Sequence, residues 1–177
     1  SPRKVDAIKA HSSTGQFWFF GTASAGFDAL CNQRANEMTW PKGPRRYDIA
    51  MVLELAKFKP IHYEATIDGE HRSFDAMLCA VANGPAFGGG MMIAPDAKVD
   101  DGFIDLFIVH AMSRLELLKV FLKVYSGSHV SHPAVEFIRA KSVKLSSGNM
   151  PVYSDGEARG HSPLSSTIVP GALSVFA

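Results

Sequence analysis

The sequence predicts a mainly β domain, an antiparallel β-sandwich with a few helical insertions. Short segments rich in β-branched and aromatic residues recur from one end of the chain to the other, whereas three segments have the spacing of helices. Many short strands and few helices are typical of a sandwich or barrel of antiparallel strands. The length suits one domain, residues 1–177, and 46% apolar residues with 20% charged ones can build a sizeable core.

The N-terminal third predicts two strands followed by two helices. Residues 3–9 and 16–22 have the composition of strands, and residues 23–37 predict a turn into a short helix. Residues 45–58 fit a second helix, which Pro60 stops. We expect one face of this helix to carry four residues at helical spacing: Ile49, Val52, Leu53 and Ala56.

A hairpin is predicted around the Asp-Gly pair at residues 68–69. Apolar and polar residues alternate in residues 61–67 and again in residues 74–80. Asp-Gly between two such segments is the strongest local sign of a two-residue hairpin turn. This turn places Tyr63 opposite Phe74 on one buried face, so the first Asp-Gly-Glu triplet of the chain is interpreted as structural.

The middle of the chain predicts a bend, two strands and a third helix. The glycines of residues 84–90 let the backbone bend sharply or approach another surface closely, and residues 91–95 look like a strand. The second half of residues 100–111 predicts a further strand.

Residues 113–125 are the clearest helix of the sequence. Ser113 and Glu116 have the spacing of a capping box, and Gly127 ends the helix. Four apolar residues line one face of it: Leu115, Leu118, Leu122 and Tyr125.

The last quarter of the chain contains a second Asp-Gly-Glu triplet, at residues 155–157. Residues 158–163 offer no alternating apolar partner for a strand at residues 150–153, so a tight hairpin is poorly supported here. The two carboxylates are therefore expected at the exposed end of a strand, where a functional and a structural role both stay open. Five short strands are predicted in this part of the chain: residues 134–140, 141–147, 150–157, 165–171 and 172–177.

Composition excludes several classes of function. The formal net charge is +1 and the Lys and Arg residues are scattered, so the chain has no electrostatic footprint for nucleic acid. No apolar run is long enough to cross a bilayer, and the first residues lack the pattern of a signal peptide. The sequence instead begins directly with a predicted strand, which suggests a chain cut at a domain boundary. Cys31 and Cys79 lie far apart in apolar surroundings and predict two buried thiols in a reducing compartment.

Several motifs are weak when taken alone. The glycines of residues 84–90 lack the Lys-Ser or Lys-Thr of a phosphate-binding loop, and Ser24 is not in a nucleophile elbow. His129 and His132 have no partners for a zinc site and are interpreted as loop residues. An acidic group has the residue types of a hard-cation site, but taken alone a solvated turn with Asp105 facing solvent explains it better: Asp96, Asp100, Asp101 and Asp105.

Three segments taken together resemble one family. "GTASAGFDA", "VANGPAFGGGMMIAPDAKVDDGFIDLFIV" and "YSDGE" are similar, in the same order, to the C-terminal half of the diacylglycerol kinase catalytic family, which includes bacterial lipid kinases and the sphingosine and ceramide kinases. The resemblance implies a two-domain enzyme that transfers the γ-phosphoryl group of ATP to a lipid hydroxyl. In such kinases an N-terminal domain carries a Gly-Gly-Asp-Gly-Thr loop, and that loop is absent here. The chain therefore looks like the second domain only and is expected to be inactive alone.

The resemblance also implies roles for particular residues. Asp155 matches the proposed general base, and Glu157 lies where it could approach the nucleotide or its metal. A structural Mg²⁺ would be held by Asp101 and by the backbone carbonyls of Lys98 and Phe103. A nearby carboxylate suits this chemistry, because it can take the proton of the lipid hydroxyl as the phosphoryl group transfers.

The partners implied are a diacylglycerol-like lipid substrate, the N-terminal kinase domain with its ATP, and a membrane surface that a cytoplasmic enzyme meets peripherally. Self-association stays open. The competing hypothesis is a non-enzymatic β-sandwich module that binds a lipid or a protein in an apolar groove. A purely structural sandwich would leave the acidic triplet at residues 155–157 unexplained.

Overall fold

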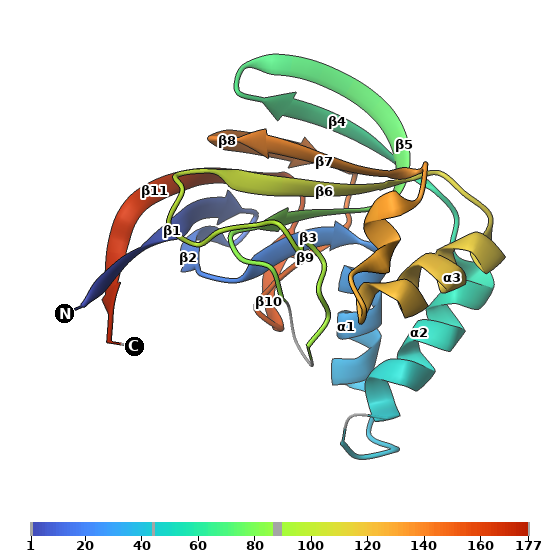
Figure 1. The fold of residues 1–177 in the computed structure, drawn as a ribbon. Coiled ribbons are helices and arrows are strands. Elements are labelled where there is room, and N and C mark those ends of the chain that lie inside the picture. Colours follow the sequence, from blue (N-terminus) through green and yellow to red (C-terminus); the bar gives the residue numbers. More distant parts are fainter. Residues whose placement is uncertain (1, 44, 87–89, 177) are drawn as a thin grey trace.

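A computed structural model describes residues 2–43, 45–86 and 90–176, and over these residues eleven strands form one antiparallel sheet that curls over on itself (Figure 1). In the same part of the chain, three α-helices gather at one end of the sheet. The predicted fold class, a mainly β antiparallel sandwich with helical insertions, is confirmed.

The elements follow one another with short connections except around residues 83–103. The helices are α1 (Phe27–Glu37), α2 (Arg45–Lys57), α3 (Arg114–Val124) and the 3-10 turn η1 (Ser128–Ser131). The strands are β1 (Arg3–Ser12), β2 (Gly15–Phe19), β3 (Thr22–Gly26), β4 (Ile61–Ile67), β5 (Glu70–Ala82), β6 (Ile104–His110), β7 (Val135–Ala140), β8 (Ser142–Ser146), β9 (Pro151–Ser154), β10 (Glu157–His161) and β11 (Leu164–Val175). In space they are ordered β10-β9-β3-β5-β4-β8-β11-β1-β2, and β6 pairs with β5 and β7.

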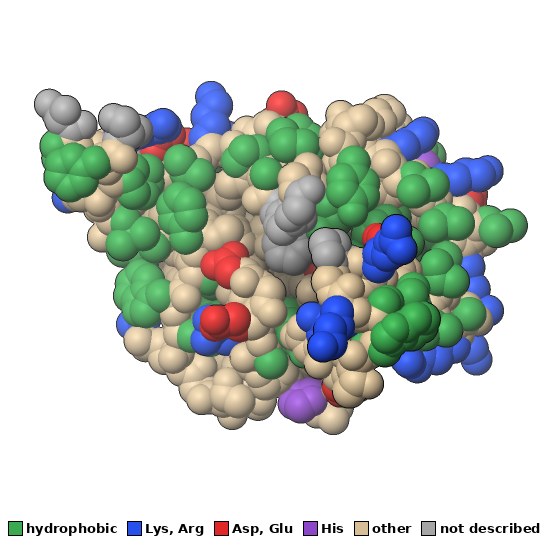
Figure 2. Space-filling model, turned by 90° about the horizontal axis from the view of Figure 1, so that it is seen from below, with side chains coloured by type: hydrophobic (Ala, Val, Ile, Leu, Met, Phe, Trp, Pro, Cys, Tyr) green, Lys and Arg blue, Asp and Glu red, His purple; other side chains and the backbone are tan. Residues whose placement is uncertain are grey.

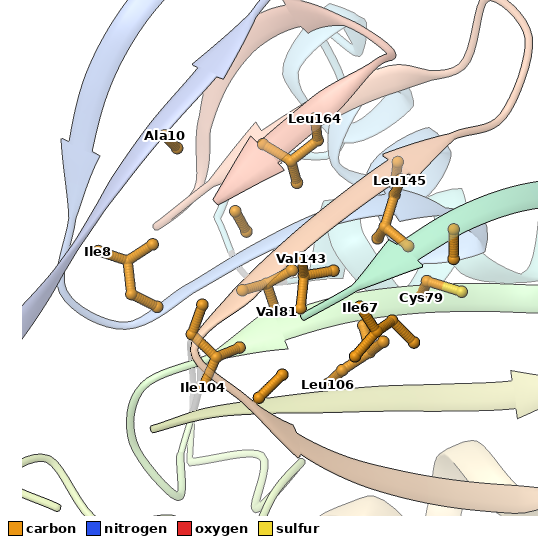
Figure 3. Close-up of a cluster of buried hydrophobic side chains, with 14 of the residues drawn as sticks. Ile8, Ala10, Ile67, Cys79, Val81, Ile104, Leu106, Val143, Leu145 and Leu164 are labelled. Carbon is orange, nitrogen blue, oxygen red and sulfur yellow. The ribbon is translucent and has the colours of Figure 1, made fainter. Parts of the chain in front are cut away.

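The curled sheet encloses one apolar core and the helices cover a second. Figure 3 shows the inner core, in which side chains from β1, β4, β5, β6, β8 and β11 meet between the facing parts of the sheet. The outer core packs α1, α2 and α3 against β5 and β6, with Phe27, Met77 and Phe107 among its members. Cys79 lies in the inner core and Cys31 in the outer one, and both are buried free thiols, as predicted.

Strand β3 lies near the middle of the sheet, between β5 and β9, and was not foreseen as a separate strand. The predicted strand at residues 16–22 divides into β2 and β3, and the predicted helix at 23–37 begins only at Phe27. All five residues of β3 are buried, so the strand carries no alternation of apolar and polar residues. They are also small. At Gly26 a side chain has no room, because a Cβ there would lie 2.7 Å from the Cα of Leu78 on β5.

Helices α2 and α3 form where they were predicted, and the capping box of Ser113 and Glu116 is present. Of the residues predicted to face the core, however, all four of α2 and three of the four of α3 are exposed, whereas Leu118 is partly buried. Helix α2 instead buries Ala50, Met51 and Glu54, and α3 buries Leu117, Val120 and Val124. The apolar pattern of α2 misleads because the carboxylate of Glu54 is buried in ion pairs with Arg34 and Lys57.

The two Asp-Gly pairs form the same kind of turn. Asp68 and Gly69 have φ of 48° and 92°, Asp155 and Gly156 have 49° and 83°, and each pair joins two hydrogen-bonded strands. Positive φ at both central residues is the mark of a type I′ hairpin turn. The first hairpin is confirmed, with Tyr63 opposite Phe74. The expectation that the second is not a tight hairpin is wrong, because the largely exposed β10 pairs with β9 without an apolar pattern.

Two further sequence predictions are corrected. The separate strands at residues 165–171 and 172–177 are one strand, β11, which pairs with β1 across a bulge that contains Pro170. Proline is tolerated at such a bulge because it has no N–H to donate to the ladder. Residues 91–95 do not form a strand; Met91 makes a single bridge. Of the glycine-rich stretch at 84–90, residues 87–89 lie outside the described residues.

Candidate functional site

Asp155 stands at the tip of the β9–β10 turn and its carboxylate reaches back to β3. Oδ1 accepts a hydrogen bond from the N–H of Thr22 at 2.9 Å, and Oδ2 accepts longer ones from Phe20 and Gly21 at 3.3 and 3.4 Å. The N–H of Asp155 donates to the carbonyl of Thr22 at 3.0 Å. An ionised carboxylate offers about four lone-pair positions. Three of them are used, so this carboxylate is fixed in direction and can still accept one more hydrogen.

Gly21 is required for this arrangement. A Cβ at position 21 would overlap Oδ1 of Asp155, so any other residue would push the carboxylate away from the β3 amides. The sequence analysis did not single out Gly21. Its contact with Asp155 joins residues more than 130 positions apart, and the local pattern of residues 20–22 contains no sign of it.

An apolar hollow of about 490 Å³ opens beside Asp155. Phe20 and Leu173, both exposed, line it together with Trp18. The candidate base therefore lies at the edge of an apolar surface that is open to solvent. Exposed aromatic and aliphatic side chains around a single carboxylate suit a surface that another molecule covers.

Glu157 begins β10, two residues after Asp155, and its side chain is exposed. Its Oε2 accepts a hydrogen bond from Nη2 of Arg159 at 2.7 Å, and the Arg159 guanidinium lies over the ring of Phe17. The structure thus brings Asp155 and Glu157 to one hairpin, but it directs the Glu157 carboxylate to Arg159.

A second, smaller cavity of about 40 Å³ lies between the helices and the sheet. Its polar groups are unusual, since Oδ1 of Asp28 and the hydroxyl of Tyr47 are buried and have no hydrogen-bond partner among the described residues. Burial raises the pKa of Asp28 to about 6, against the opposing effect of a hydrogen bond from Ser24. Burial, and the charge of Asp28, raise the pKa of Tyr47. The remaining lining is mostly apolar: Leu78, Ala80, Met91, Ile93, Phe107, Phe121 and Val124.

Thr22 connects this cavity with Asp155. The backbone N–H of Thr22 donates to Oδ1 of Asp155, and Thr22 is also one of the residues that line the cavity. A group bound at the Thr22 end of the cavity would therefore lie close to the candidate base. Buried polar groups without partners are costly, and they are often retained where a ligand supplies the missing hydrogen bond.

The predicted metal ligands lie in the turn that precedes β6. Asp101 accepts hydrogen bonds from the N–H of Phe103 at 3.1 Å and from Nη2 of Arg139 at 2.5 Å. The turn is also anchored by Asp6, whose carboxylate accepts the N–H of Gly102 at 2.7 Å. Arg139 thus occupies one oxygen of Asp101, and a cation there would have to displace the guanidinium. Across residues 2–43, 45–86 and 90–176, no three His, Cys, Asp or Glu side chains converge as a metal site.

Asp105 and His129 differ from their sequence interpretation. Asp105 is buried rather than facing solvent, and burial raises its pKa, which Arg139 opposes. His129 lies in η1 and is fully buried, with its Nε2 donating to the carbonyl of Ile93 at 2.9 Å. Burial lowers the pKa of His129, so the ring is neutral near pH 7. The burial of these two residues could not be predicted from the sequence, because segments far away along the chain cover β6 and η1.

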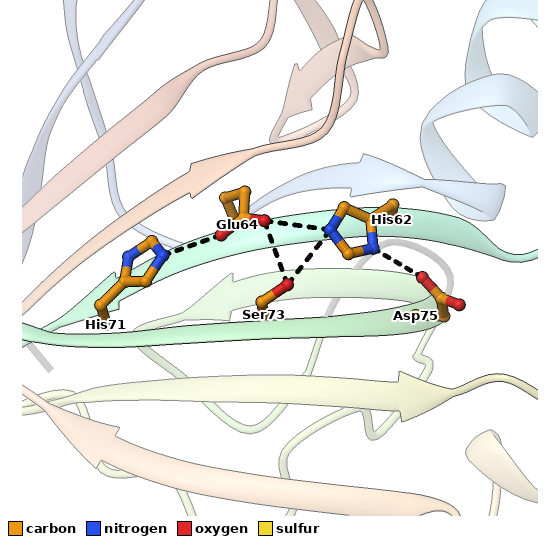
Figure 4. A network of polar contacts seen from close by, with 5 residues as sticks. All are labelled: His62, Glu64, His71, Ser73 and Asp75. Carbon is orange, nitrogen blue, oxygen red and sulfur yellow. Dashed lines mark hydrogen bonds and ion pairs between the residues drawn. The ribbon is translucent and has the colours of Figure 1, made fainter.

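An exposed polar network lies on the outer face of β4 and β5 (Figure 4). His62 bonds Asp75 through Nδ1 at 2.8 Å and contacts Ser73 and Glu64 through Nε2, and His71 contacts the same Glu64. Hydrogen bonds to Asp75 and Glu64 raise the pKa of His62. The sequence suggested no Ser-His-Asp set, yet one is formed here by residues that face each other across regular strands. All five side chains are exposed, and we interpret the network as a set of polar contacts on the surface between β4 and β5.

The comparisons with known proteins agree with this architecture. Residues 21–177 match the family described as the YegS C-terminal NAD kinase beta sandwich-like domain. A diacylglycerol kinase of Mycobacterium tuberculosis is 38% identical over 160 residues, which cover 90% of this chain and 52% of that protein. A Chromohalobacter salexigens protein named "Probable lipid kinase YegS-like" is 29% identical over 178 residues, 99% of this chain and 56% of that protein. The chain spans about half the length of the curated relatives it matches.

Solved structures show the same fold. A diacylglycerol kinase from Bacillus anthracis superposes with a TM-score of 0.64 at 19% identity and covers 98% of this chain and 53% of that one. A second structure from the same organism gives a TM-score of 0.72 at 23% identity, covering 98% and 57%. Since the family match extends over residues 21–177, the chain belongs to the YegS C-terminal NAD kinase beta sandwich-like domain family, whose curated relatives here include diacylglycerol and other lipid kinases.

Proposed function

We propose that this chain is the lipid-side domain of an ATP-dependent kinase that phosphorylates the hydroxyl of diacylglycerol or a related lipid. The observation that carries the proposal is the position of Asp155. Three backbone N–H groups hold its carboxylate, and one of them belongs to Thr22, which lines the cavity that contains Asp28 and Tyr47. The 38% identity to a diacylglycerol kinase supports the same activity.

Asp155 acts as the general base. Its remaining lone-pair position accepts the proton of the lipid hydroxyl as the phosphoryl group transfers, while the β3 amides keep the carboxylate in place. Glu157 is free to leave its exposed pair with Arg159 and approach the nucleotide or its metal. ATP binds mainly to a companion N-terminal domain, for which the greater length of the relatives leaves room.

The lipid is received between the helices and the sheet. The Asp28 and Tyr47 side chains supply polar groups for the glycerol end, and the apolar lining suits the start of an acyl chain. About 40 Å³ is close to the volume of one water molecule. Helices α2 and α3 must therefore separate from the sheet to admit a chain.

A structural Mg²⁺ belongs to the same proposal. Asp101 and the carbonyls of Lys98 and Phe103 would hold it in the turn before β6, with the ion replacing Arg139 at the carboxylate. Such an ion would stiffen the turn and take no part in proton transfer.

Activity measurements with and without the companion domain test the proposal. The isolated chain should not transfer phosphate from radiolabelled ATP to any lipid of a panel that includes diacylglycerol and sphingosine, whereas a protein that also contains the N-terminal region should. Turnover by the isolated chain would contradict the two-domain arrangement. A full-length protein that binds lipid without phosphorylating it would favour a non-enzymatic module, whose groove would be the hollow beside Trp18 and Leu173.

A further inference from the structure

Helices α2 and α3 and the connection before α2 expose several large apolar side chains, which together we call the apolar helix face. Its most exposed members are Trp40 at 78%, Leu115 at 73%, Leu122 at 62% and Val52 at 59% of their possible surface. They come from the α1–α2 connection and from both helices. The complete set is Trp40, Ile49, Val52, Leu53, Leu115, Leu122 and Tyr125.

Two contacts join the helices into one surface. Arg114 at the start of α3 donates to the carbonyls of Ala56 and Phe58 at the end of α2. Tyr47 near the start of α2 stacks on Phe121 in the second half of α3, with ring centroids 6.3 Å apart. The start of each helix therefore lies beside the end of the other, so that α2 and α3 run antiparallel next to each other.

The same segments concentrate positive charge. Residues 38–60 and 113–126 hold eight of the 18 Lys and Arg residues of the chain but only three of its 17 Asp and Glu residues, and one of those three is the buried Glu54. Among the ion pairs of the described residues, Lys57 alone of these eight cations takes part. Figure 2 shows basic side chains interspersed with hydrophobic ones on the side of the molecule that carries the helices. A chain with a net charge of +1 is thus strongly basic on this side.

We propose that the apolar helix face docks the protein onto an anionic membrane surface. Apolar side chains of an amphipathic helix enter the boundary between head groups and acyl chains, and flanking Lys and Arg residues meet the anionic lipids. The long stems of Lys and Arg can cover apolar surface while their charges stay at the head groups. None of the helices in the described part of the chain is long and apolar enough to span a bilayer.

Other occupants fit less well. A second copy of the chain would bring like charges together on both sides of the interface, which is unfavourable. The ends of β1 and β11 lie at the opposite end of the molecule from the helices (Figure 1), so a companion domain joined there would reach the hollow beside Asp155 first.

The docking surface and the cavity share their helices. Tyr47, Phe121 and Val124 belong to α2 and α3 and line the cavity that contains Asp28. If the proposed kinase function holds, a lipid passing from the membrane between these helices would reach the cavity without crossing water. This link rests on the proposed function, whereas docking itself does not.

Vesicle binding tests the proposal with two pairs of matched variants. Sedimentation with vesicles of phosphatidylcholine, with and without phosphatidylglycerol, should show binding that needs the anionic lipid and weakens as salt rises. The double variant Lys119→Ser/Lys123→Ser should lose affinity by roughly 30-fold, since each Lys near such a surface contributes on the order of tenfold or less. Lys4→Ser/Lys9→Ser, the same charge change on β1, should bind as the unmodified chain does.

The apolar part is tested in the same way. Val52→Ser/Leu122→Ser should weaken binding, whereas Leu173→Ser/Val175→Ser on β11 should not. All four pairs replace exposed side chains, and far-ultraviolet circular dichroism confirms that each variant is folded. The proposal would be overturned by equal losses of binding in test and control variants, or by binding that does not depend on phosphatidylglycerol. A dimer that Val52→Ser/Leu122→Ser dissociates would overturn it as well. Vesicle binding without any kinase activity of the full-length protein would contradict only the proposed function.

Discussion

Asp68 and Asp155 are the first central residues of two turns of the same type, and their carboxylates bind different segments of the chain. The Asp68 carboxylate accepts the N–H groups of Lys141 and Ser142 at 2.7 to 3.1 Å and ties the β4–β5 hairpin to the start of β8. The Asp155 carboxylate accepts N–H groups of residues 20–22 and ties the β9–β10 hairpin to β3. Both residues have the same turn type, and both carboxylates accept backbone N–H groups. The two positions therefore differ in the residues that surround them.

This match makes Asp68 a control for Asp155. In the full-length protein, Asp155→Asn should lower turnover by about 10²–10⁴-fold, because the amide cannot accept the proton of the lipid hydroxyl. Asp68→Asn should leave turnover intact, because Asn-Gly supports the same turn. Each change weakens comparable backbone hydrogen bonds, so the stability losses should be similar when measured by urea unfolding. Small and equal effects on turnover would mean that both triplets are only turns.

Asp28 should make stability depend on pH. Its pKa is raised to about 6 in the folded protein, against about 3.9 when unfolded. Between these values the folded chain binds more protons than the unfolded chain, so stability falls as pH rises from 4 to 6. Asp28→Asn stays neutral and should be more stable than the unmodified chain at pH 7, but not at pH 3.5.

Urea unfolding at a series of pH values measures the effect. We expect a difference of roughly 2 to 3 kcal/mol at pH 7, since the pKa rises by about two units and one unit corresponds to about 1.4 kcal/mol. Asp48→Asn, an exposed change on α2, is the control and should not alter the pH profile. A stability difference for Asp28→Asn that is the same at pH 3.5 and pH 7 would show that the carboxyl is not perturbed.

Among the elements, the turn at residues 98–103 is where the proposed Mg²⁺ would compete with Arg139 for Asp101. Asp101 is bonded to Arg139, which lies on β7 and also covers the ring of Phe103 at 4.4 Å. The guanidinium gives the turn the charge balance that a bound Mg²⁺ would otherwise supply. A metal here must offset the loss of this ion pair, which weakens its affinity.

Magnesium should raise the melting temperature of the chain if Asp101 binds it. A ligand present at 100 times its Kd stabilises the folded state by about 2.7 kcal/mol. Asp101→Ala should abolish the increase, and Arg139→Gln should enlarge it because the competing guanidinium is gone. Differential scanning fluorimetry with MgCl₂, against NaCl at equal ionic strength, measures both. No response to magnesium in either the unmodified chain or Arg139→Gln would exclude the site.

At the scale of the whole molecule, the two ends of the sheet carry different surfaces. The end with the helices is basic and apolar, and it contains the cavity of Asp28 and Tyr47. The end with β2 and the last residues of β11 presents the open hollow beside Asp155. In the proposed arrangement, the membrane would approach one end and the companion domain the other, and the lipid would meet Asp155 near Thr22, which lines the cavity. The activity and vesicle measurements above address the two ends separately.

Much of the fold could be predicted because it depends on neighbouring residues. Alternation over residues 61–67 and 74–80 was enough to predict the β4–β5 hairpin and the pair Tyr63–Phe74. The spacing of Ser113 and Glu116 was enough for the start of α3. Strand β10 escaped prediction because it is mostly exposed and is held by pairing with β9 rather than by its own pattern.

The candidate site was predictable only in part. By itself the sequence determined the β class and the turns and helices with local signals, and its resemblance led to the proposal that Asp155 is the general base. Only the tertiary structure decided that Asp155 lies on residues 20–22, that Gly21 must lack a side chain, and that most of the predicted apolar faces of α2 and α3 are exposed. The physical reason is distance along the chain. Local propensity acts over a few residues, whereas the bond between Thr22 and Asp155 joins positions 133 residues apart.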